Sequence, residues 1–412
     1  MIDFELPDDV RALRAKVAAF IDEHVLPAEP QVGTRPFFDI VAELRVEARK
    51  QGLWAPFIPV EYGGMGLGPL ANAVVQVEVG RSFTYLAAWA MNCMGPQDAT
   101  MLTLAELGTP EQKERYLRPL VEAEKRICFS MTERAAGADA TGMRTTAVRD
   151  GDTWVLNGEK WFSSGASYSD LALVMARTDE EGPRHRQFTT FLVELPNPGY
   201  RIVRDIPVMS EPFEPSFEGE GTMGHAEVRI ENLVVPHENV IGEVGGGFAT
   251  GQLRLGYGRL RHGMWSLAKA QAALDLAAAR ALERETFGKR VADRQGVQFM
   301  LADCAEQLYL SRLMIMHIAY RAERGLDLRQ ENSIAKNYIA HMLHNVVDTA
   351  LQIHGSLGYT LDTPLAAWYV EARQQRLVDG PDEVHKWSIG RAVLKAYERH
   401  GTTASATGGD LF

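Results

Sequence analysis

The order of helical and strand-like patterns is the feature that most constrains the fold of this chain. Apolar residues recur at steps of three and four from Pro7 to about Glu124, as in amphipathic helices. From about Ile127 to Val240 strands and tight turns are expected, and after Gly245-Gly246-Gly247 the pattern is helical again to about Glu398. This order predicts an α+β protein, and it lacks the strand–helix alternation of a doubly wound dinucleotide-binding fold.

Short motifs mark where the expected elements begin and end. Pro7-Asp8-Asp9 is a good acidic helix start, and Thr109-Pro110 combines a capping hydroxyl with a proline in the first turn. Asp150-Gly151 and Asn157-Gly158 are tight-turn dipeptides, so we expect a strand over 153–156 that ends at the second of them. Further strands are expected over 171–175, 188–193 and 225–230, and later helices over 268–282, 295–322, 331–354, 364–377 and 383–397.

The length of 412 residues corresponds to two or three domains of ordinary size. We expect an N-terminal helical domain over 1–126, a middle β domain over 127–242 and a C-terminal helical domain over 243–400. The small and polar residues 401–412 predict a disordered tail.

The charge balance argues against nucleic acid as a partner. The formal net charge is −11, whereas binding to phosphate backbones needs an excess of cations. No run approaches the ~20 apolar residues that would span a bilayer, so no membrane span is expected. Three scattered cysteines and an acidic start without a visible secretory signal favour the cytoplasm.

Several tempting motifs have plainer interpretations. Gly63-Gly64-Met65-Gly66 and Gly245-Gly246-Gly247 follow no strand–helix unit, so each is interpreted as a turn rather than a phosphate loop. His341 and His344 lie three residues apart on an expected helix, but without a nearby third ligand they predict no metal site. These local patterns leave the chemistry open.

Five motifs, in order along the chain, resemble the acyl-CoA dehydrogenase family. The first is 129–139, Phe-Ser-Met-Thr-Glu-Arg-Ala-Ala-Gly-Ala-Asp, which is similar to the family's Thr-Glu-Pro signature. The others are Asn-Gly-Glu-Lys-Trp-Phe-Ser-Ser-Gly at 157–165, Arg-Glu-Thr-Phe-Gly-Lys at 284–289, Gln-Ile-His-Gly-Ser-Leu-Gly-Tyr at 352–359 and Asp-Gly-Pro-Asp-Glu at 379–383. Because they extend from residue 129 to 383, the resemblance covers most of the chain.

The resemblance implies a fold, a reaction and partners. The fold would have an N-terminal helical domain, a middle β-barrel or sandwich and a C-terminal four-helix bundle. The reaction would be FAD-dependent α,β-dehydrogenation of an acyl-CoA thioester to a trans-2-enoyl-CoA, in fatty acid metabolism. The partners would be the acyl-CoA substrate, an electron-transfer flavoprotein or similar acceptor, and further copies of the chain in a homodimer or homotetramer.

By the same resemblance Asp379 is the base that removes the α-proton, where the family usually has Glu. Its own N–H would help to polarise the thioester carbonyl, and Arg259 would lie beside its carboxylate. The alternative interpretation of Asp379 is a residue that only caps the helix beginning at Pro381.

The resemblance also assigns residues to FAD. Met131 and Thr132 would contact the pyrimidine side, Phe162 would cover the ring, and Ser164 would reach N5. Ala138 stands where the family has Ser, so a hydroxyl donor would be missing there. The backbone of Gly137 would still approach the cofactor closely. The full set of expected cofactor residues is Phe129, Met131, Thr132, Gly137, Ala138, Phe162, Ser163, Ser164, Arg284, Thr286, Phe287, Gln295, Gln352, Gly355, Ser356, Pro381 and Glu383.

Two groups in that set imply an oligomer. Arg284, Thr286, Phe287 and Gln295 match residues that hold the adenosine-diphosphate half of FAD from a neighbouring subunit, and Gln352, Gly355 and Ser356 match a second strip from that neighbour. Such a site needs at least a dimer. By family analogy, a single helix over 71–91 with Glu78, Tyr85 and Trp89 would line the acyl pocket.

A finer resemblance is to the dehydrogenase part of the kinase-fused acyl-CoA dehydrogenases, which also have Asp at the base position. The basic loop Arg184-His185-Arg186 would then meet the CoA tail, or it is simply a solvated loop. Three alternatives stay open: an oxidase that uses O₂ directly, a flavin monooxygenase on the same fold, and a non-catalytic or DNA-associated relative.

Overall fold

The structure, a computed structural model, describes residues 5–210, 216–217, 221–222 and 224–409. The described chain divides into two compact units. Unit 1 comprises the described parts of Met1–Ile21, Gly68–Phe83 and Arg259–Phe412, and unit 2 comprises those of Asp22–Leu67 and Thr84–Gly258. Each unit combines segments that are distant in sequence, and the three consecutive domain ranges stay a prediction.

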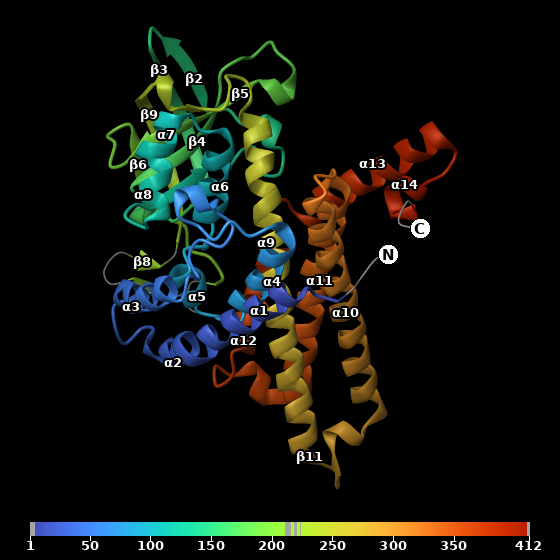
Figure 1. Cartoon of the computed structure of the whole chain (residues 1–412). Helices are drawn as coiled ribbons and strands as arrows, with labels where there is room; N and C mark the ends of the chain where they lie inside the picture. Colours follow the sequence, from blue (N-terminus) through green and yellow to red (C-terminus); the bar gives the residue numbers. More distant parts are fainter. Residues whose placement is uncertain (1–4, 211–215, 218–220, 223, 410–412) are drawn as a thin grey trace. The chain divides into compact units, whose positions relative to one another are not determined.

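The core of unit 2 is a sheet of eight strands in the order β10-β5-β4-β2-β3-β9-β6, with β1 pairing parallel to β4 (Figure 1). The expected buried strands over 171–175 and 188–193 are confirmed as β4 and β5, in which six consecutive residues of each are buried. The strands are β1 (Ile127–Ser130), β2 (Thr146–Asp150), β3 (Thr153–Ser164), β4 (Leu171–Arg177), β5 (Phe188–Glu194), β6 (Tyr200–Asp205), β9 (His225–Pro236) and β10 (Val240–Ile241), with the separate pair β7 (Ser216–Phe217) and β8 (Gly221–Thr222).

One predicted turn is wrong. Asn157-Gly158 does not end a strand, because β3 continues through it for 12 residues along β9. The dipeptide instead lies at a register shift, where Gly158 has a φ of 154° and a Cβ would lie 2.7 Å from Cα of Thr145. The Asp150-Gly151 turn is confirmed, since it joins the antiparallel strands β2 and β3.

Short helices accompany the sheet in unit 2. The capped start at Thr109 is confirmed, because its hydroxyl accepts from the N–H of Gln112 while the Gln112 side chain accepts from the N–H of Thr109. The helices are α2 (Leu26–Ala28), α3 (Phe37–Lys50), α5 (Leu86–Ala90), α6 (Gln97–Leu107), α7 (Pro110–Gln112) and α8 (Arg118–Val121).

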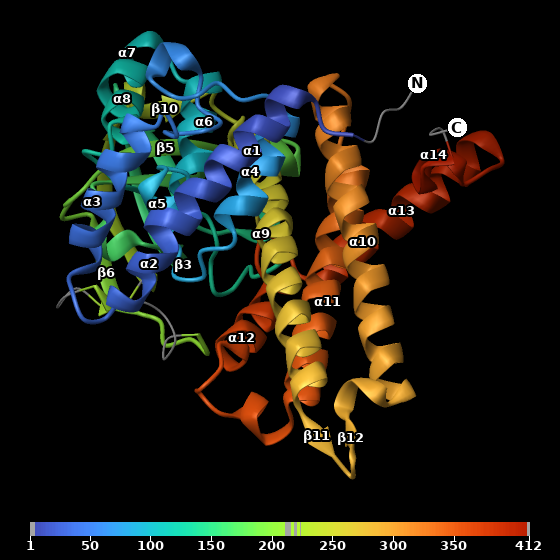
Figure 2. The same ribbon diagram turned by 60° about the horizontal axis from the view of Figure 1, so that its bottom comes forward.

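Unit 1 is a bundle in which α9 from Arg259 onward, α10 and α11 run side by side (Figure 2). Alanines on α9 pack at helical spacing against apolar residues of α10 and α11, so the alanine-rich pattern allows close helix contact. All five later helices expected from the sequence are confirmed. The helices of the unit are α1 (Asp8–Phe20), α4 (Pro69–Val79), the part of α9 (Gly247–Glu283) from Arg259 onward, α10 (Gln295–Glu323), α11 (Arg329–His354), α12 (Leu365–Gln375), α13 (Asp382–His400) and α14 (Ala404–Thr407).

The expected single helix over 71–91 is wrong. Helix α4 ends at Val79, and α5 begins only at Leu86 after Tyr85, whose φ is 64°. In α4 the Glu78 carboxylate is buried and accepts from Arg14 at 2.7 Å, so it does not face an apolar pocket. The residues predicted to line the acyl pocket therefore do not lie on a single helix.

At the C-terminus, residues 401–409 of the segment for which disorder is expected are described. Gly401 ends α13 with a φ of 66°, and α14 follows with Ala406 buried. The side-chain amide of Gln330 donates to the carbonyl of Ala406 at 3.0 Å, which ties this short helix to α11. Residues 410–412 lie outside the described residues.

Within the described ranges, no helix is both long and apolar enough to cross a membrane. Over the same ranges, His, Cys, Asp and Glu side chains form no group of three that could hold a metal ion. His341 instead lies 2.8 Å from the Asp382 carboxylate, and His344 contacts the ring of Tyr369.

Candidate active site

The predicted base, Asp379, lies in unit 1 on the turn between α12 and α13. Asp379 has a φ of 52° and Gly380 a φ of 106°, so two consecutive residues adopt left-handed backbone conformations. For a residue with a side chain this region is uncommon and is found mainly where the surroundings impose it. The turn is therefore held by its neighbours rather than by local preference.

Three side chains hold the carbonyls of this turn. The Arg259 guanidinium on α9 donates from Nε to the Asp379 carbonyl at 2.9 Å, and Nε2 of His385 lies 3.3 Å from the same oxygen. Lys336 on α11 donates from Nζ to the Gly380 carbonyl at 2.6 Å. The resemblance predicts Arg259 beside the carboxylate of the base; Nε of Arg259 donates to the backbone carbonyl of Asp379, and burial lowers the pKa of Arg259 while attraction to Asp379 opposes that shift.

The Asp379 carboxylate itself faces a histidine. Nε2 of His262 lies 3.7 Å from Oδ2 of Asp379, and the side chains are 26% and 21% exposed. Burial lowers the pKa of His262 to about 4 against the attraction of Asp379, and burial likewise lowers the pKa of His385 to about 4. Both imidazoles are thus neutral near pH 7, which leaves Asp379 beside a polar but uncharged partner.

The interpretation of Asp379 as a helix cap finds no support. The N-cap residue of α13 is Pro381, and no side chain caps that helix. In the first turn of α13, Asp382 is buried and accepts from Nε of Arg376 at 2.8 Å, while Glu383 is exposed. The carboxylate of Asp379 is therefore not engaged in capping α13.

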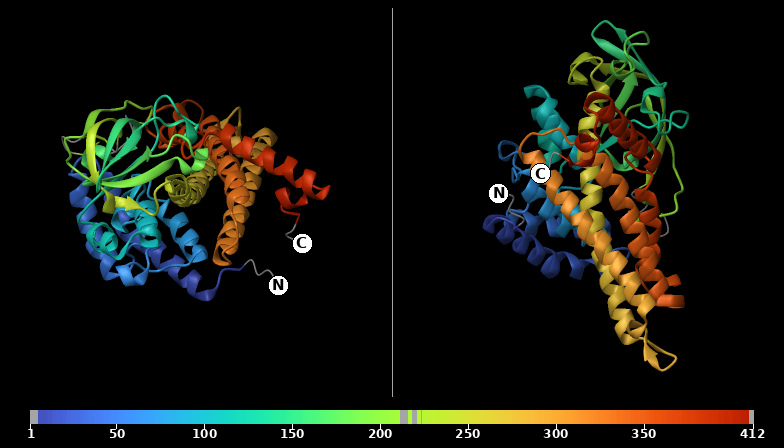
Figure 3. Two further views of the ribbon diagram at one scale, coloured as in Figure 1. Left: turned by 90° about the horizontal axis from the view of Figure 1, so that it is seen from above. Right: turned by 90° about the vertical axis from the view of Figure 1, so that its right-hand side faces the viewer.

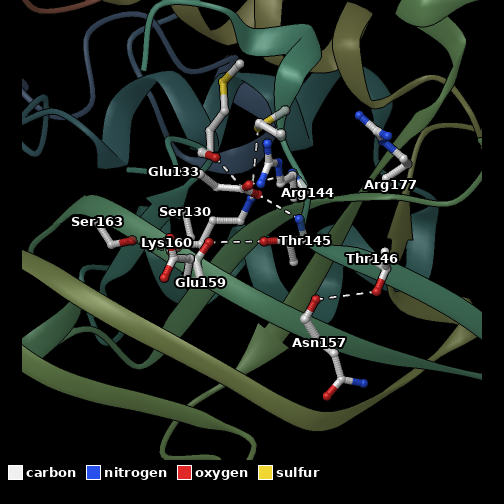
Figure 4. A network of polar contacts seen from close by, with 12 residues as sticks. Ser130, Glu133, Arg144, Thr145, Thr146, Asn157, Glu159, Lys160, Ser163 and Arg177 are labelled. Carbon is white, nitrogen blue, oxygen red and sulfur yellow. Dashed lines mark hydrogen bonds and ion pairs between the residues drawn. The ribbon is translucent and has the colours of Figure 1, made fainter. Parts of the chain in front are cut away.

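In unit 2, a buried ion pair supports the loop that follows β1 (Figure 4). Nζ of Lys160 on β3 donates to the Glu133 carboxylate at 2.8 Å and to the Met131 carbonyl at 3.0 Å, and the two side chains are 0% and 2% exposed. Glu133 also accepts from the N–H groups of Arg144 and Thr145. Burial alone would raise the pKa of Glu133, but Lys160 and these donors outweigh it and lower it.

The predicted flavin residues Phe162 and Ser164 lie where β3 bulges. The register between β3 and β9 shifts between Lys160 and Ser163, and Phe162 there has a φ of 59° and a side chain 43% exposed. Such a bulge turns one side chain away from the sheet. The neighbouring Trp161 donates its N–H to the Thr132 carbonyl, so the bulge and the loop after β1 are joined.

The side chains of the two serines at the bulge point to different partners. The Ser163 hydroxyl is buried and contacts that of Ser130 at 2.9 Å, so only its backbone can meet a ligand. Ser164 pairs with His225 across β3 and β9, and its Oγ lies 2.7 Å from Nδ1 of His225. The Arg254 guanidinium lies over the ring of Phe129, 4.0 Å from the ring centroid. Gly137, which has a φ of 53°, and Ala138 are exposed.

The residues predicted for the adenosine-diphosphate half lie at one end of the bundle in unit 1. Arg284, Thr286 and Phe287 are on or beside the hairpin of β11 (Glu285–Thr286) and β12 (Lys289–Arg290), and Gln295 starts α10 (Figure 3). Gln352 lies in the last turn of α11, and Gly355 and Ser356 follow in the 3₁₀ helix Gly355–Tyr359. Phe287 is 97% exposed, which is unusual for an aromatic side chain, and the Arg294 guanidinium lies over its ring at 6.0 Å from the centroid.

The hairpin residues are not brought together with Asp379. From Arg259 to the end of α9 at Glu283 the helix rises by about 36 Å, which exceeds the length of one dinucleotide. Asp379, Arg259, Pro381 and Glu383 therefore form one group in unit 1, and the hairpin residues form another.

Several residues with roles at these sites were missed from the sequence. His262, Lys336 and His385 contact the turn of Asp379, and His225 contacts Ser164. The pairing of Ser164 with His225 depends on the strand register, which no local pattern gives. His262 follows Arg259 by three residues on α9, so helical spacing places it on the same face and is a usable signal.

The residues present fit a flavin on chemical grounds. The bulge of β3 offers a half-exposed aromatic ring at Phe162, with a hydroxyl at Ser164 whose partner His225 is partly buried. Two neighbouring backbone segments, at Thr132 and at Trp161, are fixed to each other by a hydrogen bond. A flavin ring is flat and has polar atoms along its edge. Its binding requires an aromatic surface for the face of the ring, with small hydrogen-bonding side chains and backbone groups around that surface for the edge.

Comparison with known proteins gives the same family along most of the chain. Three acyl-CoA dehydrogenase family models match: the N-terminal domain at residues 7–124, the middle domain at 128–218 and the C-terminal domain at 245–394. The chain is 36% identical over 409 residues to the probable acyl-CoA dehydrogenase FadE2 of Mycobacterium tuberculosis, with 95% of this chain and 97% of that protein covered.

Two further relatives agree. Acyl-CoA dehydrogenase family member 11 of Gallus gallus is 34% identical over 398 residues, which cover 92% of this chain but half of that protein. The solved structure of butyryl-CoA dehydrogenase from Megasphaera elsdenii matches with a TM-score of 0.82 at 26% identity, covering 95% of this chain and 100% of that one. The chain therefore belongs to the acyl-CoA dehydrogenase family, an oxidoreductase family whose members are FAD-dependent flavoproteins.

Proposed function

We propose that this protein is an FAD-dependent acyl-CoA dehydrogenase that converts an acyl-CoA thioester into its trans-2-enoyl-CoA. The observation that carries the proposal is the turn of Asp379. Its backbone is held by Arg259 and Lys336, while its carboxylate remains partly exposed beside a neutral histidine. A carboxylate held by its backbone and not used for capping is suited to act as a base.

In this proposal the Asp379 carboxylate removes the proton from Cα as a hydride leaves Cβ. The N–H of Asp379 polarises the thioester carbonyl, so that the negative charge that develops on its oxygen is stabilised. FAD, when bound, supplies the acceptor for the hydride. Phe162, Thr132 and Ser164 orient its ring, and the Lys160–Glu133 pair keeps the loop at Met131 in place.

We further propose that FAD is completed by a second copy of the chain. The hairpin residues Arg284 and Phe287 are too distant along α9 to share one cofactor with Asp379 of the same chain. An exposed Phe287 and an arginine suited to a diphosphate support a role toward a neighbour. Co-expression of Asp379→Asn with Arg284→Ala subunits tests this, because mixed oligomers regain intact sites only if the two residues act on one cofactor from different chains.

The central test is anaerobic titration of the FAD-loaded protein with acyl-CoAs of varied length and branching. We expect bleaching of the flavin absorbance with at least one of them. Asp379→Asn should retain FAD and lose bleaching by a factor of about 10³ or more, since general-base catalysis contributes 10²–10⁴-fold. Unchanged bleaching in Asp379→Asn would remove this residue from the role of base.

The electron acceptor is resolved in a second step of the same titration. A dehydrogenase stays reduced when air is admitted and is reoxidised by an electron-transfer flavoprotein, whereas an oxidase or monooxygenase is reoxidised by O₂. Salt-sensitive binding to DNA without any bleaching would instead favour a non-catalytic relative. The three cysteines are buried and form no disulfide, which suits a reducing compartment, and we propose the cytoplasm.

A further inference from the structure

Lys336 is a buried lysine on α11 whose charge is directed at the main chain of the turn. Its side chain is 6% exposed, and Nζ donates to the Gly380 carbonyl at 2.6 Å. Burying an ammonium group costs several kcal/mol unless it is well paired. An apolar side chain would fill this place at lower cost, so the hydrogen bond needs an explanation other than packing.

The turn needs such a partner because of its backbone. Asp379 and Gly380 have φ values of 52° and 106°, and at Asp379 this left-handed conformation is unfavourable because the residue has a side chain. Arg259 on α9 holds the Asp379 carbonyl, and Lys336 on α11 holds the next carbonyl along the chain. Two cations from two helices thus fix two successive peptide groups.

We propose that Lys336 is a positioning residue for Asp379: by holding the Gly380 carbonyl it fixes the turn that presents the carboxylate. This inference rests on the proposed role of Asp379 as the base. In this proposal Lys336 acts on the base through its hydrogen bond to the Gly380 carbonyl. A displacement of the base by about 1 Å is enough to lower the rate about 10²-fold.

The charges around Lys336 support this arrangement. Burial lowers the pKa of Lys336 to about 8, with two aspartates opposing the shift and two arginines adding to it. The ammonium is therefore charged at pH 7 but titrates in an accessible range. The groups that face it are Arg259 and His262 on α9, Arg376 after α12, Asp379 in the turn, and Asp382 and His385 on α13.

The experiment compares Lys336→Met, Lys336→Arg and the wild type as FAD-loaded full-length proteins. For Lys336→Met we expect kcat to fall about 10- to 100-fold with KM and FAD content unchanged. The acidic limb of the kcat/KM profile moves to higher pH, because loss of a nearby cation raises the pKa of a carboxylate. In Lys336→Arg we expect the acidic limb of the kcat/KM profile to stay at its wild-type pH and most of the wild-type kcat to be recovered.

Lys395→Met is the matched control. Lys395 is exposed on α13, and its loss changes the net charge equally without touching the turn. It should leave kcat and the acidic limb at wild-type values. If Lys336→Met does not fold, Lys336→Gln replaces it, because glutamine keeps a hydrogen-bond donor but carries no charge. For Lys336→Gln we expect the acidic limb of the kcat/KM profile to move to higher pH and kcat to fall by less than about 10-fold.

Two results would overturn the inference. One is a Lys336→Met enzyme with wild-type kcat and an unmoved acidic limb. The other is a crystal structure of Lys336→Met in which the Gly380–Pro381 peptide and the Asp379 carboxylate keep their orientation, a result that counts even if no acyl-CoA reacts. Absence of bleaching in the wild type would contradict the proposed function instead, so the two failures are distinguishable.

Discussion

Nδ1 of His225 lies 2.7 Å from Oγ of Ser164 because the two residues are direct partners in the antiparallel pairing of β3 and β9. Burial lowers the pKa of His225, so its imidazole is neutral and has one donor and one acceptor nitrogen. The ring also packs against Phe162 at 5.3 Å between centroids. One histidine thus orients both side chains that we assign to the flavin ring.

Replacing His225 with Phe should weaken the flavin site without unfolding the sheet. The Ser164 hydroxyl loses its fixed partner and rotates freely, while the aromatic volume beside Phe162 is kept. We expect FAD affinity to fall about 5- to 10-fold, in line with the ~1 kcal/mol of one hydrogen bond. Fluorescence titration of apoprotein with FAD measures this directly.

The double variant of His225→Phe with Ser164→Ala gives the control. If the two residues act as a pair, the second substitution adds little to the first, and the coupling energy is 0.5 kcal/mol or more. Fully additive losses would show that His225 and Ser164 contribute independently, contrary to the geometry.

Acid stability should depend on His262 and His385. Their pKa values of about 4 lie below the ordinary 6.5, so between these values the unfolded chain binds more protons than the folded one. Stability is therefore fully present above pH 6.5 and is lost as the pH falls toward 4, by at most roughly 3 kcal/mol for each histidine. Urea unfolding at several pH values between 7 and 4.5 measures the slope.

The variants His262→Gln and His385→Gln separate these histidines from the carboxylates, which also titrate at low pH. Each variant should show a flatter pH dependence than the wild type in this window. A slope equal to that of the wild type in both variants would mean that neither imidazole is buried in its neutral form.

Gly380→Ala should damage both stability and activity. A Cβ at this position would lie 2.8 Å from Nε2 of His385, and the φ of 106° is unfavourable for alanine. We expect a loss of about 1–3 kcal/mol in unfolding free energy and a marked loss of kcat. Chemical denaturation and steady-state kinetics measure the two effects.

Gly390→Ala is the matched control, because a Cβ there meets no atom within 4 Å and the residue lies inside α13. It should be neutral or stabilising by up to about 1 kcal/mol, as alanine favours helix. Equal losses in the two variants would indicate that the turn of Gly380 has no special backbone requirement.

The sequence predicts most of the fold because its long helices have strong periodicity. The helices α10 and α11 begin and end within two residues of the predicted positions. The errors occur where tertiary contacts override local signals. Asn157-Gly158 has turn chemistry, but β9 pairs on both sides of it, and the expected helix over 71–91 is broken at Tyr85.

The site is predicted less completely than the fold. The motifs identify Asp379, Phe162 and Ser164 as candidate site residues. The structure shows what holds each of them: hydrogen bonds to the turn of Asp379, the bulge of β3 at Phe162 and the cross-strand partner of Ser164. These supports come from residues distant in sequence, such as Lys336 for the turn and His225 for Ser164. No local pattern encodes such pairings, since they depend on register and packing.

Lys160→Met should be among the most destabilising single changes in unit 2. It leaves the Glu133 carboxylate buried without its cation, a loss that typically costs 3–5 kcal/mol. Without Lys160, burial raises the pKa of Glu133 above its unfolded value, so the variant loses further stability as the pH rises from 4.5 to 7. Urea unfolding at both pH values should show the larger deficit at pH 7.

Removing both charges should recover part of this loss. In the double variant Lys160→Met with Glu133→Gln, a neutral amide replaces the carboxylate, and its single oxygen still accepts from one of the two N–H groups, of Arg144 and Thr145, that donate to different oxygens of Glu133. We expect the double variant to be more stable than Lys160→Met alone at pH 7, and its deficit to be independent of pH. A double variant as unstable as the sum of the single ones would mean that each residue acts through contacts of its own, and the ion pair would then not be what holds the loop at Met131.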